Sequence, residues 1–121
     1  MADRTTVVLG ASPKADRYSN MAVRSLVRHQ EPVVAIGLRP GAIEGTPIVT
    51  ELPEGTVVDT VTLYMGAENQ QAWHDRILAM RPKRIIFNPG AENEGLERAA
   101  NAAGIRTEHA CTLVMLSTGQ Y

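Results

Sequence analysis

The stretch from Val7 to Asn20 constrains the fold of this chain more than any other. It reads Val-Val-Leu-Gly-Ala-Ser-Pro-Lys-Ala-Asp-Arg-Tyr-Ser-Asn. An apolar run ends in Gly-Ala-Ser, a polar loop with two cations follows, and Ser19 is the expected N-cap of a helix. A strand, a tight turn and a helix N-terminus therefore follow one another. Helix N-termini carry unpaired N–H groups and partial positive charge, so the turn suits an anion such as a nucleotide diphosphate.

Strand-like and helix-like segments alternate along the rest of the chain. The expected strands are residues 5–9, 33–37, 46–49, 57–64, 83–87 and 105–110, and the expected helices are 19–30, 68–80 and 91–103. Strands that alternate with helices form parallel sheets with right-handed crossovers. We therefore expect one α/β domain over residues 1–121, Rossmann-like, with a mostly parallel sheet of five or six strands flanked by helices. No element is assigned to residues 111–121.

Composition argues against several classes of partner. The formal net charge is -1, which gives no electrostatic case for a nucleic-acid or membrane partner. No apolar run approaches the roughly 20 residues of a membrane helix. The single cysteine, Cys111, excludes an internal disulfide and fits a reducing compartment. We expect a cytoplasmic protein.

Residues that follow the expected strands are small or polar. Doubly wound parallel sheets bind ligands beyond the carboxyl ends of their strands, and small residues let a flat ligand approach the backbone. The predicted binding residues at these ends are Gly10, Ala11, Ser12, Arg39, Pro40, Met65, Gly66, Asn88, Pro89, Gly90 and Asn93, with Lys14 and Arg17 at the mouth of the first loop and Tyr18 at the start of the next helix.

The first turn departs from the G-x-G-x-x-G fingerprint of dinucleotide sites. Gly10 is followed by Ala11 and Ser12, and the acidic residue that would hold a ribose 2′-hydroxyl after the second strand is replaced by Arg39. A cation there suits a phosphate on the ribose. The favoured ligand is therefore coenzyme A (CoA), with its 3′-phosphate, or NADP, with its 2′-phosphate; plain NAD fits less well.

Two motifs together resemble a known family. Gly-Ala-Ser-Pro-Lys-x-x-Arg-x-Ser-Asn begins at Gly10, and Asn-Pro-Gly-Ala-Glu-Asn begins at Asn88. They resemble the small stand-alone CoA-binding domain proteins, which are similar to the CoA-binding domain of the succinyl-CoA synthetase α subunit. The resemblance implies that the pyrophosphate is surrounded by Gly10, Ser12, Lys14, Arg17, Ser19 and Asn20, and the adenosine side by Arg39 and Pro40.

The chain also departs from this family. The usual ending, a Cys followed by a basic stretch that contains His, is replaced by Thr112–Ser117. The ligase's second domain, which carries the phosphorylated histidine, has no counterpart, so the resemblance does not imply ligase activity.

Catalytic groups are scarce in the predicted loops. Glu92 is the only plausible base there, and no second group is evidently placed to work with it. His109 and Cys111 share a face of a strand but lack further metal ligands. We therefore predict no catalytic residue and no metal site.

Three functions remain open after this reading. The favoured one is a protein that binds CoA or acyl-CoA, a small-molecule nucleotide ligand, without catalytic activity of its own. The second is a small NADP-linked oxidoreductase or a subunit of a CoA-dependent enzyme. The third is a structural or regulatory subunit with a vestigial pocket. A protein partner or a homo-oligomer is compatible with each.

Overall fold

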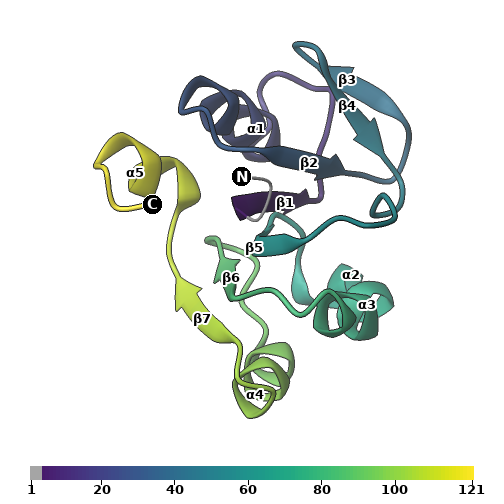
Figure 1. Ribbon diagram of the computed structural model, residues 1–121, viewed down its shortest axis with the longest axis vertical. Coiled ribbons are helices and arrows are strands. Elements are labelled where there is room, and N and C mark those ends of the chain that lie inside the picture. The colour runs from purple at the N-terminus through teal and green to yellow at the C-terminus, as the bar shows by residue number, and fades with distance from the viewer. Residues whose placement is uncertain (1–3) are drawn as a thin grey trace.

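The computed structural model describes residues 4–121 as one sheet with helices on both faces (Figure 1). The strands are β1 (Thr5–Leu9), β2 (Val33–Ile36), β3 (Gly41–Ile43), β4 (Thr46–Val49), β5 (Val58–Leu63), β6 (Arg84–Phe87) and β7 (Arg106–His109). The helices are α1 (Tyr18–Arg28), α2 (Ala67–Gln70), the 3-10 turn η2 (Gln71–Trp73), α3 (His74–Ala79), α4 (Glu94–Ala102) and α5 (Thr112–Ser117). The predicted single α/β, Rossmann-like fold is confirmed.

The strand order is β3-β4-β2-β1-β5-β6-β7. Every pair is parallel except β3 with β4. The sheet has seven strands rather than five or six because the turn-like segment Gly41–Ile43 pairs antiparallel with β4. From β1 the chain moves outward to β2 on one side, and β5 lies on the other side of β1. The order therefore reverses between β1 and β5, which is where such sheets bind ligands.

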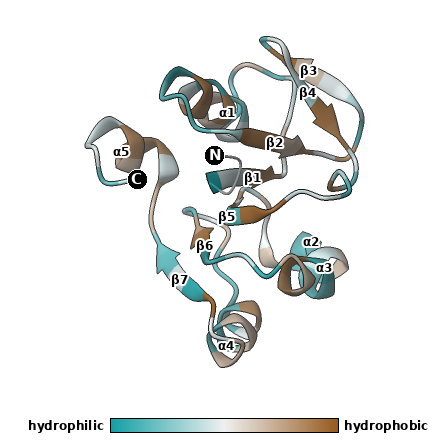
Figure 2. Cartoon of the chain, viewed as in Figure 1, coloured by the Kyte–Doolittle hydropathy of each residue, from teal (hydrophilic) through white to brown (hydrophobic). Residues whose placement is uncertain are grey.

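Two apolar layers cover the two faces of the sheet. On one face Val8 packs in a cluster with Val23 and Leu26 of α1, and on the other Leu9 packs in a cluster with Ile77 and Leu96. All five residues of β1 are buried, which explains why this strand lacks polar alternation. Figure 2 shows the contrast with β7 at the edge, which is hydrophilic.

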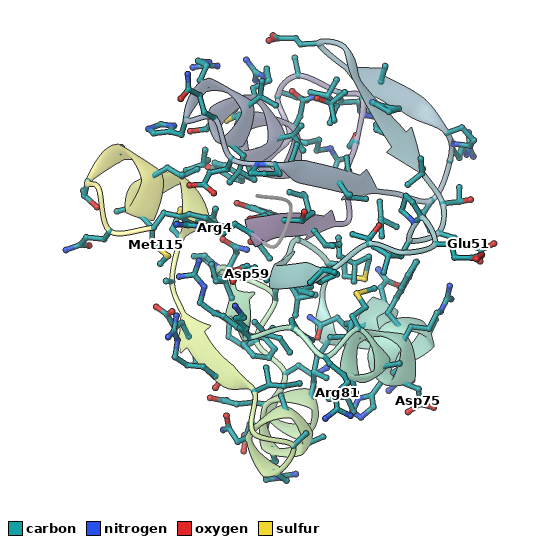
Figure 3. All side chains as sticks on the ribbon, in the orientation of Figure 1. Arg4, Glu51, Asp59, Asp75, Arg81 and Met115 are labelled. Atoms are coloured by element: carbon teal, nitrogen blue, oxygen red, sulfur yellow. The ribbon has the colours of Figure 1, made fainter. Side chains whose placement is uncertain are left out.

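Charged side chains lie mostly at the outside of this layered structure. Figure 3 shows Glu51, Asp75 and Arg81 pointing outward at the periphery, and all three are exposed. No helix among the described residues is long and apolar enough to cross a membrane.

The helices after β5 and β6 differ from the predicted ones. The expected helix 68–80 is interrupted, because a 3-10 turn separates α2 from α3. The expected helix 91–103 begins only at Glu94, where Asn93 caps it.

The segment after β7 forms a helix and returns to the central strands. Asn88 Oδ1 accepts the N–H of Thr112 at 2.9 Å, at the start of α5. Beyond α5, the hydroxyls of Tyr121 and Thr6 share a hydrogen bond, and the guanidinium of the buried Arg84 lies 4.6 Å from the centre of the Tyr121 ring. Residues 112–121 therefore cover the α1 side of the sheet beside β1 and β6.

Candidate functional site

A pocket of about 240 Å³ lies over the carboxyl ends of β1, β5 and β6. Its walls come from the three loops that follow these strands and from the first residues of α1. The lining residues are Gly10, Ser12, Arg17, Tyr18, Ser19, Tyr64, Met65, Gly66, Pro89, Gly90 and Ala91. The set contains one cation and no acidic residue.

The structure gathers part of the predicted site into this pocket. The predicted residues that line it are Gly10, Ser12, Arg17, Tyr18, Ser19, Met65, Gly66, Pro89 and Gly90. The predicted residues that do not are Ala11, Lys14, Asn20, Arg39, Pro40, Asn88 and Asn93. Tyr64 and Ala91 line the pocket although sequence analysis did not select them. Contact of any of these residues with a ligand stays a prediction.

Gly10 lets β1 turn tightly into the pocket wall. Its φ is +101°, and a Cβ atom at this position would lie 2.8 Å from the carbonyl oxygen of Tyr64. The N–H groups of Gly10 and Ala11 both donate to the carbonyl oxygen of Ile36 at 2.9 Å. The turn is therefore pressed against both neighbouring strands, and only glycine fits there.

The N-terminus of α1 faces this pocket without a cap. The helix begins at Tyr18, and the N-cap residue is Arg17, whose side chain makes no capping hydrogen bond. The prediction that Ser19 is the cap is wrong, because Ser19 lies inside the first turn, where it lines the pocket. The first turn also contains no acidic residue. The N–H groups that a helix leaves unpaired at its start therefore remain for another acceptor.

Asn88 and Asn93, the predicted asparagines between β6 and α4, form hydrogen bonds within the protein. Asn88 is buried, and its Nδ2 donates to Thr62 Oγ1 at 2.6 Å and to the carbonyl oxygen of Leu63 at 2.8 Å. Asn93 Oδ1 accepts the N–H of Leu96 at 3.1 Å as the cap of α4. These amides fix the start of α5 and of α4 at the edge of the pocket.

Gln70 joins two walls of the pocket. It is completely buried, and its Nε2 donates to the carbonyl oxygens of Met65 at 2.8 Å and Ala91 at 2.7 Å. Its Oε1 accepts from Nδ2 of Asn93 at 2.9 Å. Sequence analysis missed Gln70, because one glutamine in a helical pattern does not indicate that it is buried.

Two titratable groups beside the pocket have shifted pKa values. Hydrogen bonds from the N–H groups of Glu92 itself and of Gly90 lower the pKa of the exposed Glu92 carboxyl. Burial raises the pKa of Tyr64 to about 12, although the hydroxyls of Thr112 and Thr62 counteract this shift. The Tyr64 hydroxyl makes no hydrogen bond of regular geometry with any described residue.

His109 and Cys111 have different surroundings. His109 Nε2 lies 3.0 Å from Oε1 of Glu97, and its ring stacks on Phe87 with the centroids 5.3 Å apart. Cys111 is a half-buried free thiol. Within residues 4–121 no group of three His, Cys, Asp or Glu residues lies close enough to hold a metal ion.

The strand order, with a pocket where it reverses, is that of a Rossmann-like domain. The chain belongs to the family described as CoA binding domain, whose model matches residues 4–117. No curated protein matches the chain significantly.

Solved structures share this fold over nearly the whole chain. A crystal structure described only as that of an uncharacterized protein is 41% identical, with a TM-score of 0.90, and the match covers 100% of both chains. Cell-free ID.343 from Thermus thermophilus is 22% identical, with a TM-score of 0.85, over 98% of this chain and 91% of that one. A hypothetical protein from Pyrococcus horikoshii OT3 is 17% identical, with a TM-score of 0.84, over 93% and 81%.

Proposed function

We propose that this protein binds CoA or acyl-CoA in the pocket at the carboxyl edge of the sheet. The uncapped N-terminus of α1 carries this proposal, because its first residues line the pocket and no lining residue is acidic. Unpaired N–H groups and the helix dipole attract an anion. The guanidinium of Arg17 adds a charged donor. The pyrophosphate of the ligand would lie at this end of α1.

The adenosine side of the ligand would lie toward β2. Ile36 is paired with Leu9 in the sheet, so the loops after β1 and β2 begin side by side. A Cβ atom on Gly37 would come within 2.4 Å of the carbonyl oxygen of Ala11, which shows how closely these loops run. Arg39 is exposed two residues further on, beyond the pocket lining. We expect its guanidinium to meet the 3′-phosphate of CoA, with Pro40 beside the adenosine.

Calorimetric titration with CoA, dephospho-CoA, NADPH and NAD tests this proposal. We expect CoA to bind about tenfold more tightly than dephospho-CoA, because a charge-assisted contact contributes about 1.5–3 kcal/mol, less where it is exposed. The variant Arg39→Gln removes that difference, and Arg28→Gln, on the far end of α1, preserves it. Tighter binding of NADPH than of CoA points instead to the NADP-linked alternative. No binding of any nucleotide contradicts the proposal.

We also propose that the protein performs no chemistry on its ligand. The pocket lining contains Ser12 and Ser19 but no His, Cys, Asp, Glu or Lys that would activate a serine hydroxyl as a nucleophile. Tyr64, with a pKa of about 12, stays protonated at neutral pH. Acyl-CoA thioesters mixed with the protein should remain intact, and turnover that disappears in Glu92→Gln would make it an enzyme.

The free Cys111 is in keeping with a cytoplasmic protein.

A further inference from the structure

The loop between β1 and α1 has little support of its own. Residues 13–17 are exposed and belong to no helix or strand. Within the loop, the N–H of Lys14 donates to Ser12 Oγ at 3.2 Å, and the N–H of Arg17 donates to the carbonyl oxygen of Lys14 at 3.1 Å. Two local hydrogen bonds do not fix such a loop, so its shape depends on groups outside it.

Arg24 supplies that support from the second turn of α1. Its Nη2 donates to the carbonyl oxygen of Ala15 at 2.9 Å, and its Nε donates to Oδ1 of Asn20 at 2.8 Å. Nδ2 of the buried Asn20 in turn donates to the carbonyl oxygen of Ser12 at 2.9 Å. One guanidinium therefore holds the loop at two carbonyl groups, directly at Ala15 and through Asn20 at Ser12.

We propose that Arg24 is a positioning residue for the ligand-binding loop. It does not line the pocket, so it acts through Ser12 and the loop that leads to Arg17. The effect on ligand affinity rests on the proposed CoA binding, whereas the effect on the loop does not. The role requires arginine, because the planar guanidinium presents Nε–H and Nη–H in a fixed fork that a lysine ammonium does not reproduce.

The charge of Arg24 does not explain its placement. Among residues 4–121 Arg24 forms an ion pair with Glu44, whose Oε2 lies 4.0 Å from Nε and whose side chain is 70% exposed. Such a pair contributes little to stability. Instead, Nε donates to the neutral amide oxygen of Asn20 at 2.8 Å and Nη2 donates to the neutral carbonyl oxygen of Ala15 at 2.9 Å. The geometry of the guanidinium, rather than its charge, is therefore the property to test.

Three variants separate geometry from charge. Arg24→Lys keeps the charge and loses the fork, Arg24→Gln loses both, and Arg28→Gln removes an exposed cation one turn further along α1 as the control. Limited trypsin cleavage after Lys14 reports on the loop without any ligand, and calorimetry with CoA reports on binding. We expect both Arg24 variants to be cleaved after Lys14 several-fold faster and to bind CoA about tenfold more weakly. Arg28→Gln should match the wild type in both.

Each other result decides against one of the two ideas. If Arg24→Lys is cleaved and binds CoA like the wild type, the effect is due to charge and the positioning role is overturned. If Arg24→Gln gives the same cleavage and binding as Arg28→Gln, Arg24 has no effect on the loop and the positioning role is overturned as well. If cleavage of the Arg24 variants after the buried Arg84 accelerates as much as cleavage after Lys14, the whole protein unfolds more readily, and this result also overturns the positioning role. If the wild type fails to bind CoA while cleavage after Lys14 still responds as expected, the proposed function is wrong and the positioning role stands.

Discussion

The helices α1 and α4 both start at the carboxyl edge of the sheet, yet their N-termini are built in opposite ways. Asn93 caps α4 through its side chain, and Glu94 and Glu97 place two acids in its first turn. The start of α1 has no side-chain cap, no acid, and the cation Arg17 at the N-cap position. The start of α4 is capped by one of the protein's own side chains, whereas the start of α1 is not, and there we propose that the pyrophosphate binds.

The loops that lead to these two helices also differ, in the burial of the side chains that hold them. The loop before α4 is fixed by the buried amides of Gln70 and Asn88. The loop before α1 is exposed and depends on Arg24 and Asn20. The loop before α4 is thus held by fully buried amides, whereas the guanidinium that holds the loop before α1 is only partly buried.

The variant with the largest expected effect gives α1 a side-chain cap like that of α4. Arg17 has φ -81° and ψ 141°, which is the extended conformation of an N-cap residue. In Arg17→Asp the carboxylate should accept the free N–H groups of α1 and raise the free energy of unfolding by about 0.5–2 kcal/mol. The same carboxylate repels the pyrophosphate, so CoA affinity should fall about a thousandfold, or about 4 kcal/mol.

Arg17→Gln is the control for this experiment. It removes the guanidinium but adds no negative charge, so calorimetry should give a loss of about tenfold. Equal losses in Arg17→Asp and Arg17→Gln would mean that the ligand does not reach the N-terminus of α1.

The glycines before the two helices give the second test. Gly10 and Gly90 both have positive φ, but only at Gly10 would a Cβ meet another atom within 4 Å. Alanine at either position strains the backbone by roughly 1–3 kcal/mol. Gly10→Ala should lower the free energy of unfolding further, by about 1 kcal/mol or more, because it also overlaps the Tyr64 carbonyl. Urea denaturation of the two variants measures this difference, and equal values would contradict the close approach of β1 and β5.

Removal of the two candidate caps has a smaller effect. Asn93→Ala should reduce the free energy of unfolding by about 2 kcal/mol, because the N–H of Leu96 loses its acceptor and the buried Oε1 of Gln70 loses a donor. Ser19→Ala removes no cap and should therefore reduce it by less than Asn93→Ala does. Urea denaturation of both proteins suffices, and a larger loss for Ser19→Ala would restore Ser19 as the cap.

Acid should weakly destabilise the loop before α4 through Glu92. The pKa of Glu92 is lowered in the folded state, so its ionised carboxylate stabilises the fold above the unfolded pKa of 4.5. That contribution should be lost as the pH falls below 4.5 and through the folded pKa. The wild type should therefore lose slightly more stability than Glu92→Gln between pH 6 and pH 3 in thermal denaturation. Parallel curves for the two proteins would show that the Gly90 contact is absent in solution.

Sequence patterns predicted the order of elements well, because buried parallel strands are continuous apolar runs. The strands β1, β2, β4, β5, β6 and β7 were all predicted, within a residue or two at their ends. The strand β3 was missed because a segment of three residues that begins with glycine forms a strand only through its pairing with β4. The helix α5 was missed because its start depends on Asn88, which lies 24 residues earlier.

For the site, the sequence predicted which loops gather at one edge of the sheet, but not the hydrogen-bond partners of individual polar residues in them. The carboxyl ends of parallel strands meet at one edge, so Gly10, Gly66 and Gly90 were expected to gather, and they line one pocket. An asparagine in such a loop is compatible with ligand contact or with an internal hydrogen bond. Only the three-dimensional contacts of Asn88 and Asn93 show that their amides bond to the protein itself.

The hydrogen bond between Thr6 and Tyr121 spans 115 residues, and this separation has a consequence during synthesis. Ribosomes add about 5–20 residues per second, so on the order of ten seconds pass between the emergence of β1 and that of its last partner. Throughout this interval the apolar surface that Leu116 covers beside Val8 stays open to water. This face of the protein therefore stays accessible to other molecules until α5 has been synthesised.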